Sequence, residues 1–170
     1  MPRHKLDAID RRILHDLQAD GRLSNVELSN RLGMSPPPCL RRLRALEKTG
    51  VIRGYHANVN PEAFGFKVMA FVEVGLSKHG EQDLQEFMAW ADQWPQIREC
   101  YLMTGDTEFL IKVVATSWEN YQEFVSRTIT KAPNVAKINS HMALRATKMA
   151  TGVPIDLGGD LSDADINSAD

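Results

Sequence analysis

Apolar side chains recur every three or four residues in the first third of the chain, a period that predicts amphipathic helices. The first helix begins after Asp7, a residue type that caps helix N-termini, and ends at Gly21. A stripe of apolar residues runs along it: Ile9, Ile13, Leu14 and Leu17. A short helix cannot bury such a stripe alone, so we expect it to pack against the helices that follow.

The second helix is marked by the capping box Ser24-Asn25-Val26-Glu27 and is short, because Gly33 stands where a left-handed C-terminal cap is expected. A third helix follows Ser35 and three prolines and runs until Gly50. The prolines leave two possible starts. Either Ser35 is the N-cap and its hydroxyl is left for a phosphate, because the prolines remove its usual donors, or the helix begins later, near Pro38.

The third helix has an apolar side and a basic side. At 100° per residue, the apolar side carries Cys39, Leu40, Leu43 and Leu46. The opposite side carries Arg41, Arg42, Ala45 and Lys48, with Arg44 at the border. A short capped helix, a glycine turn and a helix with a basic outer face describe a helix-turn-helix, which reads duplex DNA with its second helix. The alternative is an ordinary helical hairpin whose solvated face is cationic. The predicted DNA-binding set adds three residues from the preceding turn: Ser35, Pro36 and Pro38.

After the third helix, residues 51–59 have β character and form either a small wing or a pairing strand. The segment from 60 to 65 reads as a hinge. From Val68 the apolar period changes to two, which predicts a strand. A helix at about 81–93, strands at 97–103 and 109–115, a helix at about 118–130 and a strand at 135–147 complete the order βαββαβ. This order predicts a ferredoxin-like sheet covered by helices on one face, and an α+β protein overall.

The other face of that sheet needs a partner. Met69, Phe71, Cys100 and Leu102 are expected to contribute apolar side chains to it. We therefore predict a homodimer that forms through the sheets.

Charge divides the chain at the same place as the hydrophobic pattern. Residues 1–60 carry 11 basic and 6 acidic residues, a balance of +5, whereas residues 61–170 carry 9 and 16, a balance of −7. This split suggests a basic module that faces a polyanion and a separate acidic module. We predict a helix-turn-helix domain at 1–60, a βαββαβ domain at 61–150 and an acidic, disordered tail at 151–170.

The chemistry of an enzyme is not visible in the sequence. The five histidines and two cysteines have no metal-ligand spacing, and neither a glycine-rich phosphate loop nor a nucleophile motif is present. We therefore expect no metal, no cofactor and no enzymatic activity. The absence of a long apolar run predicts neither a signal peptide nor a membrane span, and the lack of a disulfide framework favours the cytoplasm.

A turn at 103–108 is a candidate ligand site. The backbone N–H groups of Gly105 and Asp106 suit a carboxylate, while the acids Asp106 and Glu108 suit an ammonium group, so the turn matches both ends of an amino acid. The alternative is a plain hairpin turn whose acids are only solvated.

These motifs together resemble the Lrp/AsnC family, the feast/famine regulators, from Leu6 to about Lys148. The segment 33–43 is similar to the recognition helix of the family's leucine-responsive branch. The βαββαβ half resembles the family's amino-acid-sensing domain, whose dimers often assemble into octamers. Gly105-Asp106-Thr107-Glu108 resembles the family's Gly-Asp-x-Asp effector loop, with Glu in place of the final Asp. The resemblance implies an effector site made of Met103, Thr104, Gly105, Asp106 and Glu108 with His141, Met142 and Ala143 from the last strand. We predict that the site at the turn is shared between neighbouring subunits.

The resemblance implies a cytoplasmic transcription regulator that binds a pseudo-palindromic operator in double-stranded DNA as a dimer or larger oligomer. An amino acid would shift it between states of different DNA affinity. The rival is an enzyme on the same scaffold, since sirohaem decarboxylases resemble this family. Such an enzyme would need histidines lining a tetrapyrrole cleft, and it would have little use for a basic recognition helix. A purely structural sensor module is the third possibility, which the intact helix-turn-helix disfavours.

Overall fold

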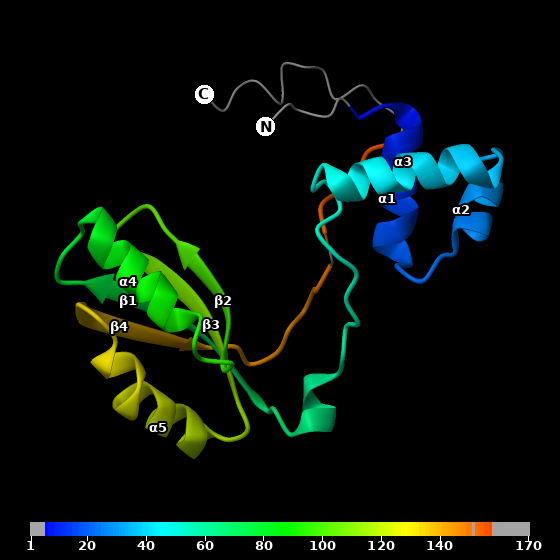
Figure 1. Cartoon of the computed structure of the whole chain (residues 1–170). Helices are drawn as coiled ribbons and strands as arrows, with labels where there is room; N and C mark the ends of the chain where they lie inside the picture. The colour runs from blue at the N-terminus through cyan, green and yellow to red at the C-terminus, as the bar shows by residue number, and fades with distance from the viewer. Residues whose placement is uncertain (1–5, 151, 158–170) are drawn as a thin grey trace. The chain divides into compact units, whose positions relative to one another are not determined.

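The computed structural model describes residues 6–150 and 152–157, which divide into two compact units. One unit contains the described residues up to Asn58 together with those from Met149 onward, and the other spans Val59–Lys148 (Figure 1). Each unit has a hydrophobic core of its own.

The first unit is built from three helices, α1 (Ala8–Ala19), α2 (Asn25–Arg31) and α3 (Pro36–Lys48). Four side chains with no exposed surface form its centre: Ile13, Leu28, Cys39 and Leu46. The predicted apolar side of α3 therefore faces the other helices. Three amphipathic helices suffice for a core here because each contributes one stripe to the same centre.

Local hydrogen bonds explain where these helices begin. The predicted capping box is confirmed, since the Glu27 N–H donates to Ser24 Oγ at 3.2 Å and the Ser24 N–H donates to Glu27 Oε2 at 2.8 Å. The start of α3 is now settled in favour of Ser35 as the N-cap residue, with Pro36 as the first helical residue. The Ser35 side chain makes no capping hydrogen bond, as expected when prolines replace the usual donors.

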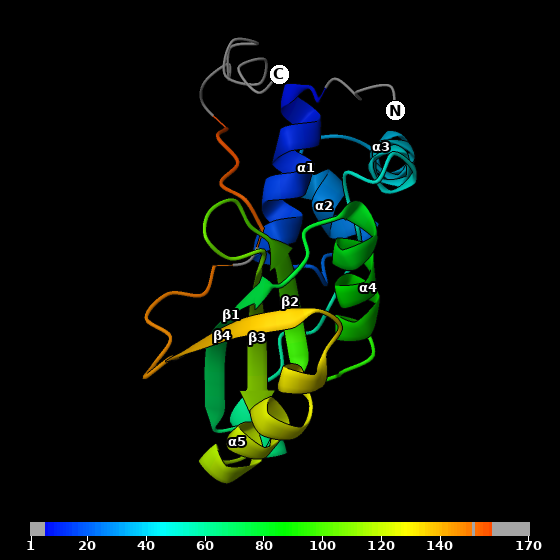
Figure 2. The same ribbon diagram turned by 90° about the vertical axis from the view of Figure 1, so that its left-hand side faces the viewer.

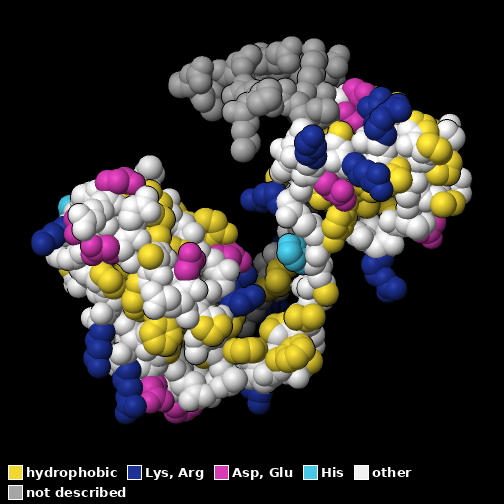
Figure 3. All heavy atoms as spheres, in the orientation of Figure 1, with side chains coloured by type: hydrophobic (Ala, Val, Ile, Leu, Met, Phe, Trp, Pro, Cys, Tyr) yellow, Lys and Arg dark blue, Asp and Glu magenta, His cyan; other side chains and the backbone are white. Residues whose placement is uncertain are grey.

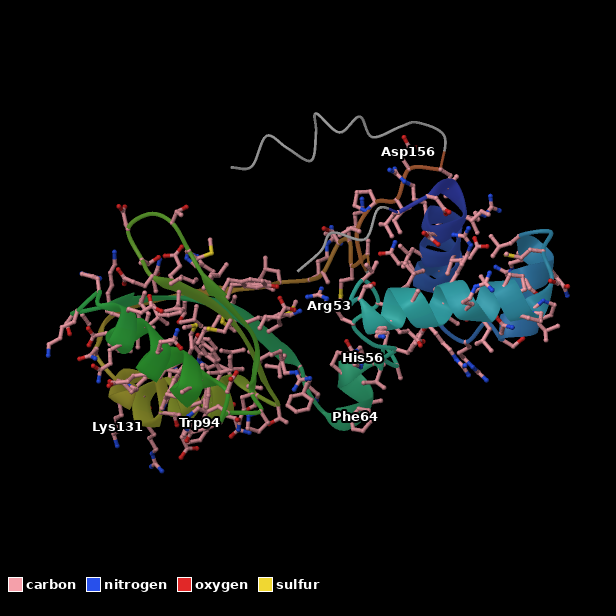
Figure 4. All side chains as sticks on the ribbon, turned by 45° about the horizontal axis from the view of Figure 1, so that its top comes forward. Arg53, His56, Phe64, Trp94, Lys131 and Asp156 are labelled. Atoms are coloured by element: carbon pink, nitrogen blue, oxygen red, sulfur yellow. The ribbon has the colours of Figure 1, made fainter. Side chains whose placement is uncertain are left out.

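The segment after α3 does not form a strand. Residues 51–60 have no regular secondary structure, and Tyr55 and Val59 are 47% and 57% exposed. A strand needs a neighbour that satisfies its backbone groups, and no described part of this chain forms a strand beside residues 51–60. The predicted hinge contains a short 3₁₀ helix, η1 (Pro61–Phe64), closed by Gly65 at a φ of 79°. Arg53 and His56 lie on the segment before the hinge and Phe64 lies within it (Figure 4).

The second unit has the predicted order βαββαβ. Its elements are β1 (Val68–Leu76), α4 (Glu81–Ala91), β2 (Ile97–Leu102), β3 (Phe109–Ala115), α5 (Trp118–Arg127) and β4 (Val135–Met142), with a 3₁₀ turn, η2 (Ile129–Lys131), before the last strand. The strands form one antiparallel sheet in the order β2-β3-β1-β4. The last strand ends at Met142 and is thus shorter than the predicted segment 135–147.

Helices α4 and α5 pack on one face of this sheet (Figure 1 and Figure 2). Alternate residues of β1 and β3 point toward them, and Phe87 of α4 stacks on Phe109 of β3 with ring centroids 4.4 Å apart. The opposite face carries half-buried apolar side chains and a cross-strand ion pair. The apolar members are Met69, Phe71, Leu110 and Val114.

The prediction that Cys100 and Leu102 lie on that open face is wrong. They pair with Ile111 and Phe109 and therefore lie on the helix-covered face. The reason is an irregularity between Ile97 and Glu99, where the strand register shifts by one residue. Because side chains alternate between faces, one extra residue moves everything after it to the other side.

The predicted disordered tail falls mostly outside the described residues. Its described part, residues 152–157, forms neither helix nor strand. Val153 in this part is nevertheless hydrogen-bonded to Gln18 in the last turns of α1, a contact that the sequence did not indicate.

Candidate nucleic-acid interface and effector turn

The turn between α2 and α3 sets the direction of α3. Gly33 has a φ of 65°, and the Met34 N–H donates to the Ser29 carbonyl at 3.0 Å. The Asn25 side chain donates to the Pro36 carbonyl at 3.0 Å, which ties the start of α3 to the start of α2. Both ends of the turn are therefore held by hydrogen bonds, as a recognition helix on a rigid support requires.

The outward side of α3 is basic. Arg41, Arg44 and Lys48 are all exposed, and they stand three or four residues apart, so they share one face of the helix. Ser35 and Pro36 are exposed at the N-terminal end of α3, while Pro38 and Ala45 are half-buried. Basic side chains are visible on this unit in Figure 3. We refer to Arg41, Arg44 and Lys48 below as the basic face of α3.

Arg42, however, does not lie on this face, and its predicted position opposite the apolar side is corrected. Its Nη1 donates to Asp7 Oδ2 at 2.7 Å and to Asp10 Oδ1 at 2.9 Å, and its side chain is only 32% exposed. Asp7 and Asp10 form the capping box of α1. Arg42 therefore joins α3 to the N-terminus of α1 and is not free to reach outward.

This contact affects the ionisation of both partners. Burial by itself would raise the pKa of Asp7, but hydrogen bonds from the Asp10 N–H and from Arg42 outweigh burial and lower the pKa. Hydrogen bonds to Asp7 and Asp10 raise the pKa of Arg42. Sequence spacing alone does not identify this clamp, because its two acids lie more than 30 positions away on another helix.

The turn at 103–108 is closed by a hydrogen bond from the Met103 N–H to the Glu108 carbonyl at 2.8 Å. Gly105 has a φ of 125°, and a Cβ added there would meet nothing within 4 Å. Met103, Thr104, Gly105 and Asp106 are exposed. The tip of the turn is therefore open to solvent, and Asp106 is accessible.

Glu108 is directed away from that tip. Its Oε2 accepts from the Leu76 N–H at 2.6 Å, and its Oε1 lies 2.8 Å from His79 Nδ1. The Leu76 hydrogen bond is the main cause that lowers the pKa of Glu108. The glutamate thus anchors the turn to the end of β1, a contact for which the sequence contained no visible signal. Its side chain is one methylene longer than that of aspartate, which lets the carboxylate reach Leu76 and His79.

His141, Met142 and Ala143 lie far from this turn within one chain. His141 and Met142 pair with Phe71 and Ala70, near the beginning of β1. The 103–108 turn instead adjoins the end of β1, since Phe109 pairs with Val74. Three to five residues of strand correspond to about 10–17 Å. The structure therefore does not bring the two halves of the predicted effector site together within a single chain.

The remaining candidates for a functional site are metal-ligating side chains and the histidines. Among the described residues, no group of three or more His, Cys, Asp or Glu side chains is placed to hold a metal ion. His15 lies on α1, His56 after α3, and His79 and His141 each lie near a glutamate on a different part of the sheet unit. His4 lies outside the described residues. No described helix combines the length and apolarity needed to cross a membrane.

A cavity of about 400 Å³ lies beside α5 in the second unit. It is lined by residues of that helix, by the end of β3, and by Phe66, Trp94 and Gln96. Trp94 is labelled in Figure 4. None of the predicted effector residues lines this cavity, so it does not coincide with the candidate effector turn.

Two protein-family models match this chain, one in its N-terminal part and one in its C-terminal part. Residues 6–53 match a winged helix-turn-helix DNA-binding model, and residues 69–153 match the Lrp/AsnC ligand binding domain. A leucine-responsive regulatory protein from Rhizobium meliloti is 44% identical over 153 residues, covering 90% of this chain and 98% of the relative. The Escherichia coli K12 protein of the same name is 36% identical, covering 91% and 94%.

Solved structures agree. A transcriptional regulator from Neisseria meningitidis in complex with L-methionine has a TM-score of 0.84 and 36% identity, covering 89% of this chain and 98% of that one. A feast or famine regulatory protein from M. tuberculosis, also complexed with L-methionine, has a TM-score of 0.81 and 30% identity, covering 89% and 99%. The predicted family resemblance and α+β fold class are thereby confirmed.

The Arg42 clamp predicts a large difference between two neighbouring arginines. Replacing Arg42 with Ala should lower the free energy of opening of α3 by about 1.5–3 kcal/mol, because hydrogen bonds to charged partners are lost and Asp10 stays buried. The control Arg41→Ala should change it by less than about 0.5 kcal/mol. Hydrogen exchange of the α3 amides measures both. Equal protection in the two variants would contradict the clamp.

The same pair predicts a pH dependence. Because the pKa of Asp7 is lowered in the folded state, its ionised form stabilises the fold above its ordinary value of 3.8. This contribution is lost as the pH falls through the folded pKa. The difference in α3 protection between the unmodified chain and Arg42→Ala should therefore shrink below about pH 4. If the difference in protection stays constant down to pH 2.5, it arises from packing of the Arg42 side chain and not from the charge of Asp7.

Proposed function

The chain belongs to the Lrp/AsnC family of transcription regulators, and on this basis we propose that it binds operator DNA as a symmetric oligomer whose DNA affinity responds to an amino acid. The observation that carries the proposal is the basic face of α3. Its three cations point to solvent while the opposite side of the helix is packed and clamped.

In the proposed complex α3 enters the major groove. Arg41, Arg44 and Lys48 contact phosphates or guanine edges, which are the common partners of such side chains. The Ser35 hydroxyl, which makes no capping hydrogen bond to α3, donates to a phosphate near the helix N-terminus. Two copies bind half-sites about one helical turn apart, so the operator is pseudo-palindromic. Arg42 contributes by holding α3 in place.

The open face of the sheet is the proposed dimer interface. It carries Met69, Phe71, Leu110 and Val114 around the ion pair between Lys112 Nζ and Glu99 Oε1, which are 2.8 Å apart. A second copy of the same face would remove these apolar side chains from water, which is worth about 25 cal/mol per Å². Larger assemblies, including an octamer, would be built from such dimers.

The proposed effector is an amino acid bound at the 103–108 turn. The exposed N–H groups at Gly105 and Asp106 offer partners for its carboxylate, and the Asp106 carboxylate offers one for its ammonium group. His141, Met142 and Ala143 would come from a neighbouring subunit, because one chain keeps them at the other end of the sheet. Glu108 fixes the shape of the turn. Support comes from the two similar structures that contain L-methionine.

The basic face predicts a specific salt dependence of DNA binding. Replacing Arg41 with Ala should weaken binding and reduce the slope of log affinity against log salt by about 0.9 if one phosphate contact is lost. The control Arg127→Ala removes the same charge from α5 in the other unit and should leave the slope unchanged. Fluorescence anisotropy of a labelled duplex between 50 and 200 mM salt, about the range over which such contacts weaken, measures both. Unchanged affinity and slope in Arg41→Ala would refute the proposed contact.

The dimer interface predicts that a charge on the open face blocks assembly. Phe71→Lys places an ammonium group next to Lys112 and in the centre of the apolar face, so light scattering should give a smaller particle. Phe64→Lys is the control, since Phe64 is 66% exposed on η1. An unchanged mass for Phe71→Lys would place the interface elsewhere.

The effector turn predicts a selective loss of ligand stabilisation. In thermal-shift assays with a panel of amino acids, a ligand at 100 times its dissociation constant should stabilise the folded protein by about 2.7 kcal/mol. Asp106→Asn should abolish the shift, whereas Glu123→Gln on α5 should retain it. The site would be excluded if no amino acid shifts the midpoint, or if Asp106→Asn responds normally.

A further inference from the structure

The described residues 152–157, which we call the strap, are attached to the DNA-binding unit. The Gln18 Nε2 donates to the Val153 carbonyl at 2.9 Å, and the Val153 N–H donates to Gln18 Oε1 at 2.7 Å. One side-chain amide thus satisfies both backbone groups of a residue 135 positions away. The strap runs beside α1, and its Asp156 is labelled in Figure 4.

The strap depends on a glycine. Gly152 has a φ of 73°, and a Cβ at this position would overlap the Gln18 side-chain amide. A larger residue would therefore be strained in its backbone and would also displace the amide that holds Val153. This arrangement is specific to one residue type, so it can be removed by a single methyl group.

The chain that continues from the strap is acidic. Residues 158–170 contain four aspartates and no lysine or arginine: Asp160, Asp163, Asp165 and Asp170. Thirteen residues span up to about 43 Å when extended. A domain of about 50 residues has a radius of gyration of about 10 Å, so this segment is long enough to reach any face of the unit to which the strap attaches it.

The complementary surface on that unit is the basic face of α3, where Arg41, Arg44 and Lys48 are exposed. We propose that residues 158–170 are an intramolecular competitor of DNA that occupies this basic face. The inference rests on the proposed function, because the same three cations are assigned to DNA. The segment lies beyond residue 153, where the match to the ligand-binding model ends.

The strap is what makes the competition effective. Exposed ion pairs are each worth only about 0–1 kcal/mol, so a free acidic peptide would bind this face weakly. Attachment through a short connection raises the local concentration of the aspartates to about the millimolar range. Because the pairs are exposed, salt screens them, and the competition weakens as the ionic strength rises.

The first test compares DNA binding by the full chain and by a full-length variant with Asn at positions 160, 163, 165 and 170. We expect the Asn variant to bind a labelled duplex about twofold to tenfold more tightly at low salt, since a millimolar local competitor has been removed. The difference should disappear above about 0.5 M salt, where the Debye length is only a few ångströms. Equal affinities at low salt would overturn the inference.

The second test does not involve DNA, so its outcome is separate from that of the proposed function. Carbodiimide joins a lysine amine to a carboxylate in direct contact, and mass spectrometry locates the link. We expect Lys48 to be linked to an aspartate of 158–170 at low salt, and the link to be reduced at least severalfold by Gly152→Ala. Gly21→Ala is the matched control, because a Cβ there meets its nearest atoms at an ordinary 3.8 Å. Absence of the Lys48 link, or equal yields in the two variants, would overturn the inference.

Discussion

Burial of one side of α3 decides what the rest of the first unit can do. Cys39 and Leu46 are fully buried against α1 and α2, and Arg42 is held by Asp7 and Asp10 at the start of α1. These three contacts fix the rotation of α3 about its own axis, because only one rotation keeps its apolar side buried. That rotation turns Arg41, Arg44 and Lys48 outward. The packing of the small core therefore selects which of the four clustered cations are available to a polyanion.

The second unit is governed by a different constraint, the unequal covering of its sheet. Both helices lie on one face, so the other face keeps half-buried apolar residues that no described helix covers. The same topology separates the 103–108 turn from residues 141–143. The turn adjoins the end of β1, whereas residues 141–143 lie beside its beginning. In the proposed dimer, association would cover the open face and bring the two parts of the proposed effector site together, which would link assembly to effector binding.

Charge is distributed unevenly along the chain. The basic excess lies in residues 1–60 and the acidic excess in residues 61–170. The strap is attached to the helical unit by the two hydrogen bonds between the Gln18 side chain and the backbone of Val153. In the proposed competition with DNA, weak and screened ion pairs would suffice because the covalent connection keeps the two partners near one another.

The sequence by itself determined the features that depend on neighbours along the chain. The Ser24–Glu27 capping box, the apolar stripes of the helices and the βαββαβ order all follow from residues within a few positions of one another, so periodicity and capping rules were sufficient. The tertiary structure alone decided the role of Arg42, the anchoring of Glu108 to Leu76 and His79, and the faces of Cys100 and Leu102. The first two depend on partners about 30 positions away in sequence, and the third depends on a one-residue register shift in β2. Local patterns do not contain that information, because a side chain's direction is known only after its distant neighbours are in place.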